Sequence, residues 1–461
     1  MEKLKTAFNH IRSTALLNMA IKCGVVVLFF IISLWWLPAA YISGVLLALF
    51  ILAEFDVRSI YYILFFHAFE NVMLVFYFTA FGLFAVISLT KSFRKTPLLF
   101  VITSAVFVLY CLAFTIPRFG YMLPMFFAGI LLVLVCLTSN KEINFKAALY
   151  WFIAGILGAS IIGLLINFIP GAILFTYLPF GRELWEHRSF GLQRFAALSN
   201  NTNHLHAMTS AALAGLLVLD LQKKIRLREF IPLFAIMFAI SFATIARTFM
   251  ITFAVMMTAY LVLKIIRHKR QSLKTFAFLG LALIVVCGAM YHYTLANMMR
   301  LNIIPERQII QNNRPLRQET FEIEYRPDID DPGRGGIWRR NLRDWSSSAY
   351  TVFFGRGIDS PNIGNVTQHN TLVFILVKTG LVGLILFIAF FFSLFYTMYK
   401  VKKFKFDTSL LIIFLTLACL AMTESIYPRV MFFIFIAFFI LSTEQKEEIE
   451  IETTDTKNIE Q

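Results

Sequence analysis

The sequence predicts an all-α, polytopic membrane helix bundle of 12–14 transmembrane helices, with a large external loop that carries short helices. Two observations predict this fold class. Hydrophobic residues make up 59% of the 461-residue chain and charged residues only 15%, a balance that excludes an ordinary soluble globule. Apolar runs able to span a hydrocarbon core of about 30 Å also recur along the whole length.

Fourteen apolar runs are interpreted as helices. In chain order they cover residues 20–36, 38–53, 59–69, 71–89, 97–115, 121–138, 147–168, 205–220, 230–246, 248–265, 274–292, 370–398, 408–423 and 429–443. The third run is short and ends at His67 and Glu70, so a re-entrant half-helix is an alternative interpretation of it. Losing two crossings together would preserve the topology that follows.

Basic residues predict the side of each connection, because Lys and Arg near helix ends stay on the cytoplasmic side. They gather before the first helix and near residues 91–95, 141–146, 223–228, 267–274 and 400–405. With fourteen crossings, all of these clusters and both termini are cytoplasmic. Three other connections are then external: residues 169–204, the turn near Arg247 and residues 293–369.

The predicted organisation has six parts. They are N-terminal transmembrane helices (1–168), an external Arg-containing loop (169–204), transmembrane helices with the Arg247 turn (205–292), a large external loop (293–369), C-terminal transmembrane helices (370–443) and a disordered cytoplasmic tail (444–461). The first apolar segment lacks a small-residue cleavage site, so we expect an uncleaved anchor rather than a signal peptide.

Two compositional features exclude some kinds of site. All five cysteines lie in apolar runs, which argues against a disulfide framework and against a cysteine metal site. The net charge of +15 mostly reflects the cytoplasmic clusters and requires no nucleic-acid partner.

The first external segment with distinctive chemistry is residues 181–204. Three arginines and a cluster of asparagines lead there into the apolar helix predicted from residue 205. A helix that begins at the outer surface presents free N–H groups and a positive dipole end, and a nearby Arg reinforces this as an anion site. Arg194 is the candidate anion-binding residue and Arg188 competes with it, whereas the asparagines are interpreted as helix caps.

Arg247 interrupts the long apolar run at residues 230–266. A guanidinium at the bilayer centre costs about 3 kcal/mol even on a lenient insertion scale. Splitting the run into a helical hairpin instead puts Arg247 at its external turn, on the surface that carries Arg194. The alternative role is structural, as an ion pair with Glu424 or Glu70.

The large external loop uses only arginine as its basic residue. Its ten basic residues are Arg300, Arg307, Arg314, Arg317, Arg326, Arg334, Arg339, Arg340, Arg343 and Arg356. The planar fork of arginine binds phosphate oxygens in pairs and keeps its charge, which suits a diphosphate site. Compositional drift is the alternative explanation.

Three short segments inside this loop have patterns of their own. Trp338, Leu342 and Trp345 have the spacing of an amphipathic helix that lies on the membrane face. Residues 354–357, Phe-Gly-Arg-Gly, predict a flexible turn. Residues 328–330, Asp-Ile-Asp, match a divalent-metal motif, but a position between two prolines favours a solvated turn.

The loop ends at Thr367-Gln368-His369-Asn370, and a long apolar run follows at once. His369 therefore stands at a membrane surface, where it can meet a lipid-borne and a water-borne substrate together. The alternative is a helix-start residue that satisfies free backbone donors. Further on, Lys378 is predicted about 13 Å along the helix axis, and Gly380 and Gly383 would let another helix approach closely.

His369-Asn370, nine residues, and then Gly380-Leu381-Val382-Gly383 resemble the His-Asn…Gly-x-x-Gly signature of the bacterial O-antigen ligase and O-antigen polymerase superfamily. Three further features of residues 185–440 agree with it: the Arg194 segment, the Arg247 turn, and a loop with a Trp and a Gly-x-Gly before the histidine. Two positions depart from the family pattern. Ala197 replaces a frequent Gly, and Ala246 replaces a frequent Ser.

The resemblance implies a metal-independent membrane glycosyltransferase without a cofactor. It would transfer a glycan from an undecaprenyl-diphosphate carrier to a lipid or glycan acceptor, such as lipid A-core, at the outer, periplasmic face of the bacterial inner membrane. His369 would be the general base, and Arg194 and Arg247, with Arg188 as the competitor, would bind the diphosphate. The supporting residues would be Asn370, Gly380, Gly383 and Lys378.

Other functions remain open at this point, among them a protein O-glycosylating enzyme of the same superfamily. A polymerase that joins carrier-linked repeat units of O-antigen, capsule or exopolysaccharide differs from a ligase only in its acceptor. A polyprenyl-glycan transporter belongs to another class and would bind near the bilayer midplane, beside broken helices in repeated halves. The polar residues of this chain gather instead at one rim, which favours an enzyme that acts on membrane lipids.

Overall fold

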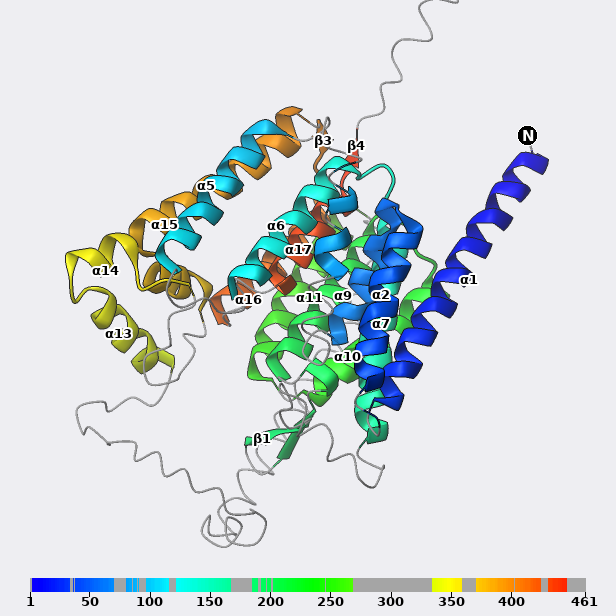
Figure 1. The fold of residues 1–461 in the computed structure, drawn as a ribbon, viewed down its shortest axis with the longest axis horizontal. Helices are drawn as coiled ribbons and strands as arrows, with labels where there is room; N and C mark the ends of the chain where they lie inside the picture. The colour runs from blue at the N-terminus through cyan, green and yellow to red at the C-terminus, as the bar shows by residue number, and fades with distance from the viewer. Residues whose placement is uncertain are drawn as a thin grey trace, which may run out of the picture.

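The computed structural model describes residues 2–33, 36, 38–69, 80–84, 86–88, 90, 97–115, 122–166, 185–189, 192–195, 197–199, 202–244, 246–267, 334–358, 370–401, 403–423 and 430–445. Over these residues the chain is an all-α membrane helix bundle with two short β-ribbons (Figure 1). Four of the described helices are long and apolar enough to cross a membrane, and several shorter apolar helices accompany them. The predicted fold class is therefore confirmed.

The helices follow one another in nearly the predicted order. They are α1 (Glu2–Ile32), α2 (Pro38–Glu54), α3 (Ile60–Phe66), α5 (Leu98–Thr115), α6 (Met122–Thr138), α7 (Phe145–Ile166), α9 (Thr202–Leu221), α10 (Leu227–Ala243), α11 (Arg247–Arg267), α13 (Arg334–Trp345), α14 (Ala349–Phe354), α15 (Thr371–Tyr396), α16 (Leu410–Thr423) and α17 (Val430–Ser442). Short 3-10 turns occur at η1 (Val57–Ser59), η2 (His67–Phe69) and η4 (Ala197–Ser199), and a π-turn at η7 (Thr397–Val401). The predicted helix 274–292 lies outside the described residues.

The first helix is longer than predicted, because α1 begins at Glu2 and not near residue 20. The preceding segment contains no glycine or proline, so the helix continues beyond its apolar part. The predicted run at 59–69 is a short buried helix, α3, between the two 3-10 turns η1 and η2.

Two β-ribbons were not predicted. β1 (Trp185–Ser189) pairs with β2 (Leu192–Phe195) inside the predicted external Arg-containing loop. β3 (Phe404–Lys405) pairs with β4 (Glu444–Gln445). The expectation of a disordered tail from residue 444 is therefore wrong for its first two residues, and residues 446–461 lie outside the described part.

The helix α9 is the centre of the bundle, and most of its side chains are buried. Its small residues, from Ala207 to Gly215, let neighbouring helices approach closely. A Cβ atom on Gly215 would come within 2.8 Å of Leu149 on α7. The helices α7, α10, α11 and α16 pack around α9, so α9 fixes the relative positions of the segments at both of its ends.

Polar contacts between distant parts of the chain hold one end of the bundle together. We call this end, formed by residues 139–146, 220–229, 264–267, 403–409 and 442–445, the basic end. Its contacts join Lys146 to Glu229 (2.7 Å), Lys264 to Asp220 (2.8 Å), Gln222 to the Ser442 carbonyl (3.0 Å) and Arg267 to Asp407. Clusters that the sequence predicts to be cytoplasmic therefore meet at one end.

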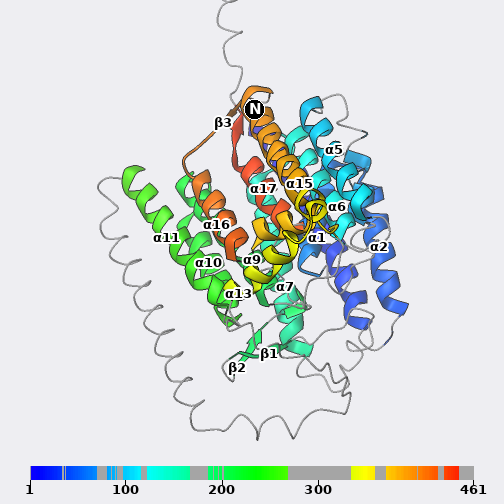
Figure 2. The same cartoon turned by 90° about the vertical axis from the view of Figure 1, so that its left-hand side faces the viewer.

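The other end of the bundle follows from the direction of each helix. Because α9, α11, α15 and α17 end at the basic end and α7, α10 and α16 begin there, residues 197–202, 243–247, 370–371 and 422–423 gather at the opposite end, which we call the site end. β1 lies at the bottom of the bundle and β3 at the top in both Figure 1 and Figure 2. The Arg-bearing ribbon β1–β2 is therefore at the site end.

Candidate functional site

The two arginines predicted before α9 lie on one β-ribbon. Arg188 is in β1 and Arg194 is in β2, and Glu186 is paired directly with Arg194 across the ribbon. The register is irregular between Glu186 and Ser189. The two alternative candidates for the anion-binding residue, Arg194 and Arg188, thus lie on neighbouring strands of one ribbon.

The ribbon continues into α9 through the turn η4, whose first residue has an unusual backbone. Ala197 is buried and has φ 49°, a left-handed conformation that favours glycine. It lies against Gly163 near the end of α7, where a Cβ atom on Gly163 would come within 2.9 Å of the Ala197 Cα atom. The backbone conformation at Ala197 is therefore one that glycine adopts more readily than alanine.

The predicted hairpin around Arg247 is confirmed. The helix α10 ends at Ala243 and α11 begins at Arg247. The turn between them is closed locally, because the Thr244 hydroxyl donates to the Ser241 carbonyl (2.6 Å) and accepts from the Ala246 N–H (3.3 Å). Arg247 therefore stands at a helix N-terminus at the site end, while its alternative partners Glu70 and Glu424 lie outside the described residues.

The helix α15 is not the continuous helix that the sequence predicts over residues 370–398. Gly380 has φ 66° and ψ −171°, which breaks α15 into a first part, residues 371–379, and a second part from residue 381. Only glycine adopts this backbone conformation readily. The depth of about 13 Å expected for Lys378 along an unbroken helix axis therefore does not apply.

The end of α14 satisfies two of the carbonyl groups that the break in α15 leaves free. The Arg356 N–H donates to the Val377 carbonyl (3.2 Å), and the Gly357 N–H donates to the Lys378 carbonyl (2.9 Å). The third free carbonyl, that of Thr379, accepts a hydrogen bond of 2.6 Å from the hydroxyl of Tyr110 on α5. Residues 356–357 and α5, both distant in sequence, thus supply hydrogen-bond donors to the carbonyl groups at the break.

Two glycines make this contact possible. A Cβ atom on Gly380 would lie 2.4 Å from the Phe353 carbonyl oxygen, and one on Gly355 would lie 2.5 Å from the backbone of Lys378. Gly355 also has a positive φ of 72°. The segment predicted as a flexible turn is therefore fixed against the backbone of α15.

The second predicted glycine lies beside the same tyrosine. A Cβ atom on Gly383 would come within 3.0 Å of the Tyr110 ring and 2.2 Å of the Thr379 side chain. Gly383 thus admits α5 and Gly380 admits the end of α14, in agreement with the predicted close approach of another helix, although the break in α15 at Gly380 was not predicted. Lys378 is buried between these contacts, with its ammonium group 5.8 Å from the centre of the Phe374 ring.

Asn370 fixes the start of the first part of α15. Its Oδ1 atom accepts the Val373 N–H (3.1 Å), which caps the helix, and its Nδ2 atom donates to the Met422 carbonyl at the end of α16 (3.2 Å). The segment 371–379 therefore runs between α16 and α5. His369, the residue before it, lies outside the described residues.

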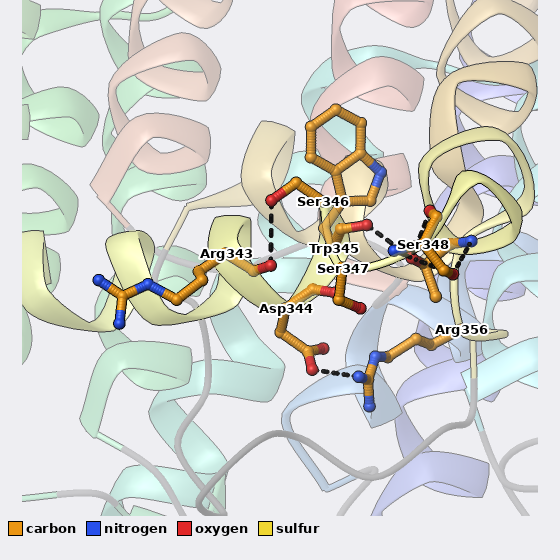
Figure 3. A network of polar contacts seen from close by, with 8 residues as sticks. Arg343, Asp344, Trp345, Ser346, Ser347, Ser348 and Arg356 are labelled. Atoms are coloured by element: carbon orange, nitrogen blue, oxygen red, sulfur yellow. Dashed lines mark hydrogen bonds and ion pairs between the residues drawn. The ribbon is translucent and has the colours of Figure 1, made fainter.

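The helices α13 and α14 form a compact unit beside this segment. Figure 3 shows Asp344 on α13 directed at Arg356, with which it forms an ion pair, and the residues 346–348 that join the two helices. Ser348 and Thr351 cap α14 reciprocally, and the Trp345 Nε1–H donates to the Val352 carbonyl (3.2 Å). This unit confirms the predicted helix around residues 338–345 and orients the segment that contacts Gly380.

The site end therefore contains several of the predicted residues. Arg188, Arg194, Arg247 and Asn370 lie on elements that begin or end there. Lys378, Gly380 and Gly383 belong to the break in α15. Among the described residues no group of three or more His, Cys, Asp or Glu side chains could hold a metal ion, and the predicted motif at 328–330 lies outside them.

Sequence reasoning missed two residues at this end. Tyr110 on α5 bonds the broken part of α15, but one hydroxyl in an apolar run gives no signal of its partner. His206 is fully buried on α9, in contact with α10 and α11. The sequence did contain a signal for His206, because an ionisable residue inside a predicted membrane helix is a candidate functional residue.

Comparison with known proteins does not identify the chain. No protein-family model matches it, and no curated protein matches it.

Proposed function

We propose that this membrane protein is a glycosyltransferase of the O-antigen ligase type, which transfers a glycan from an undecaprenyl-diphosphate carrier to an acceptor hydroxyl. The observation that carries the proposal is the common location of Arg247 at the start of α11 and Asn370 at the start of α15. His369 adjoins Asn370 in the chain. A candidate phosphate-binding residue and the residue that follows the candidate base thus belong to the same end of the bundle.

In the proposed reaction the acceptor oxygen attacks the anomeric carbon of the carrier-linked glycan. His369 accepts the hydroxyl proton as the new carbon–oxygen bond forms. The bond from that carbon to the diphosphate breaks, and its electron pair stays on the diphosphate oxygen. Arg194 and Arg247, with Arg188 as the alternative to Arg194, stabilise the charge that develops on the diphosphate. Because guanidinium groups would perform this task, the proposed reaction requires no metal ion.

The proposed location follows from the membrane topology predicted by the basic residues. The basic end faces the cytoplasm, and the site end faces the outer side of the bacterial inner membrane. At that surface the isoprenoid tail of the carrier stays in lipid while its diphosphate reaches the water interface. The partners are the carrier-linked glycan, the acceptor and the surrounding membrane lipids.

A transporter is the second candidate, and the break in α15 is the observation that favours it. Transporters often bind substrates at broken helices, through backbone groups that the break leaves free. Here the carbonyls at the break accept hydrogen bonds from residues 356–357 and from Tyr110. These groups are therefore occupied by the protein itself, which supports the enzyme over the transporter.

The test is turnover by the purified protein in nanodiscs that contain an undecaprenyl-diphosphate-linked glycan. We expect release of undecaprenyl diphosphate together with a transferred glycan. Lipid A-core and a second carrier-linked glycan, offered separately as acceptors, distinguish a ligase from a polymerase. Uptake of the glycolipid without a new glycosidic bond would favour the transporter instead.

Three variants and one additive test the assigned roles in that assay. His369→Ala should reduce turnover at least about 100-fold, the usual contribution of a general base. Arg194→Lys and Arg247→Lys should each weaken donor binding, because lysine cannot form the paired contacts of a guanidinium. EDTA should leave the rate unchanged. Undiminished product with His369→Ala would remove the histidine from the mechanism, and activity restored only by Mg²⁺ would contradict metal independence.

A further inference from the structure

His206 is the buried ionisable residue that lies beside the Arg247 turn and has no place in the proposed mechanism. It is on the second turn of α9 and is fully buried. A nonpolar residue of similar size would fill the same position without burying polar nitrogens in a membrane bundle. The use of histidine there therefore calls for an explanation in its contacts.

Those contacts reach both helices that flank Arg247. The His206 Nδ1 atom lies 3.4 Å from the hydroxyl of Ser241, on the last turn of α10, and 3.2 Å from that of Ser210 on its own helix. The imidazole ring meets the ring of Phe249, on the first turn of α11, edge to face at 5.6 Å. One side chain thus joins α9 to the residues on either side of the turn.

The turn also has hydrogen bonds of its own. Its internal hydrogen bonds involve Ser241, Thr244 and Ala246, which are near neighbours in the chain. They set the shape of the turn but not its position relative to α9. Since α9 follows directly after the ribbon that carries Arg194, the contacts of His206 also set the position of Arg247 relative to Arg194.

We infer that His206 is a positioning residue, which holds the turn between α10 and α11 against α9 and so keeps Arg247 in place relative to Arg194. Its significance for catalysis rests on the proposed function. The ring contacts Ser210, Ser241 and Phe249, none of which is assigned to the chemistry. We therefore expect His206 to affect binding of the carrier-linked donor, through the position of Arg247 relative to Arg194.

The test compares His206→Leu with His206→Asn, whose amide stands where the Nδ1 atom does. His67→Leu is the matched control, because His67 is also buried and stacks on an aromatic ring, that of Phe152, at 6.2 Å. We expect His206→Leu to raise the KM for the carrier-linked donor about 10- to 100-fold with a smaller change in kcat. His206→Asn should recover most of that loss, and His67→Leu should leave KM unchanged.

A second measurement does not depend on activity. In a cysteine-free background, spin labels at Arg247→Cys and Met422→Cys report the separation of the turn from the end of α16. His206→Leu should shift or broaden this distance, whereas His67→Leu should not. An unchanged distance in His206→Leu would overturn the inference. A changed distance in a protein whose native form transfers no glycan would uphold the positioning role and reject the proposed function.

Discussion

Two glycines determine the local structure of the site end because they have no side chain. Gly355 and Gly380 both have positive φ values, and each lies where a Cβ atom would overlap the backbone of the other segment. Their contact places the end of α14 against the break in α15. The hydrogen bonds from residues 356 and 357 to α15 depend on this close approach.

The first prediction concerns Gly380→Ala. The added Cβ atom would meet backbone atoms at 2.4–2.6 Å in a backbone conformation that only glycine adopts readily. We expect a loss of stability of about 3 kcal/mol or more, measured as thermal unfolding in detergent. Gly24→Ala in α1 is the control, because no atom lies within 4 Å of its added Cβ, and it should leave the melting temperature nearly unchanged. Equal melting temperatures for the two variants would contradict the account of the break.

The sequence indicated the importance of Gly380 but not its role. Glycines spaced like Gly380 and Gly383 in an apolar run usually indicate close helix packing, and Gly383 does face Tyr110 on α5. The break at Gly380 depends on residues 353–357, which lie more than twenty positions earlier in the chain. A local pattern carries no information about such a partner.

At the scale of elements, a side-chain hydrogen bond joins each end of the first part of α15 to another helix. Asn370 joins its start to α16 and Tyr110 joins its end to α5. Residues 371–379 therefore form a short helix between two membrane helices, directly after His369. Its position determines where the histidine segment enters the bundle.

The second prediction tests this role of Asn370. Asn370→Asp keeps the oxygen that accepts the Val373 N–H but loses the donor to the Met422 carbonyl, whereas Asn370→Ala loses both. Asn370→Ala should lower stability by about 1–2 kcal/mol through loss of the helix cap, and Asn370→Asp should lower it less. Thermal unfolding of both variants in detergent measures the difference. A larger loss for Asn370→Asp than for Asn370→Ala would contradict the capping role.

The third prediction concerns the contact between α7 and α10 at the basic end. Two hydrogen bonds lower the pKa of Glu229 below its ordinary value of 4.5, the one from Lys146 having the larger effect and the one from Tyr150 the smaller. A carboxylate with a lowered pKa stabilises the fold above pH 4.5, and this contribution is lost as the pH falls through the pKa of the folded state. The effect is small, because 35% of the Glu229 side chain is exposed.

Glu229→Gln should therefore lower the melting temperature slightly at pH 7, and this difference should shrink as the pH falls below 4.5 and through the lowered pKa of the folded state. Lys146→Gln, which removes the partner, should show the same dependence. A difference between native protein and Glu229→Gln that grows as the pH falls from 7 into the acid range would show that the carboxylate charge is not responsible.

The elements show which features the sequence could predict. The split between α10 and α11 was predictable, because a guanidinium at the bilayer centre is costly and Arg247 had to lie at a turn. The ribbon β1–β2 was not, since its pairing depends on contacts across a polar segment without a strong alternation of apolar residues. The first turns of α1 were not predicted, because the length of an apolar run shows where a helix can span the membrane and does not show where the helix begins.

At the scale of the whole molecule, the bundle separates two kinds of polar residue. The basic end holds pairs between lysine or arginine and acidic side chains, such as Lys264 with Asp220. The site end holds Arg188, Arg194 and Arg247 on elements that begin or end there. This division follows from the direction in which each helix runs. It agrees with the prediction that the basic connections lie together on one side of the membrane. The mechanism depends on it, because the carrier diphosphate must meet the arginines and His369 together.

Accessibility labelling of single cysteines tests that central claim most directly. In a cysteine-free background, membrane-impermeant maleimide would be applied to intact cells carrying Arg247→Cys, His369→Cys or, as the basic-end control, Lys223→Cys. Positions 247 and 369 should react from outside the inner membrane, and position 223 should react only after the membrane is opened. Labelling of 247 and 369 from opposite sides would contradict the account.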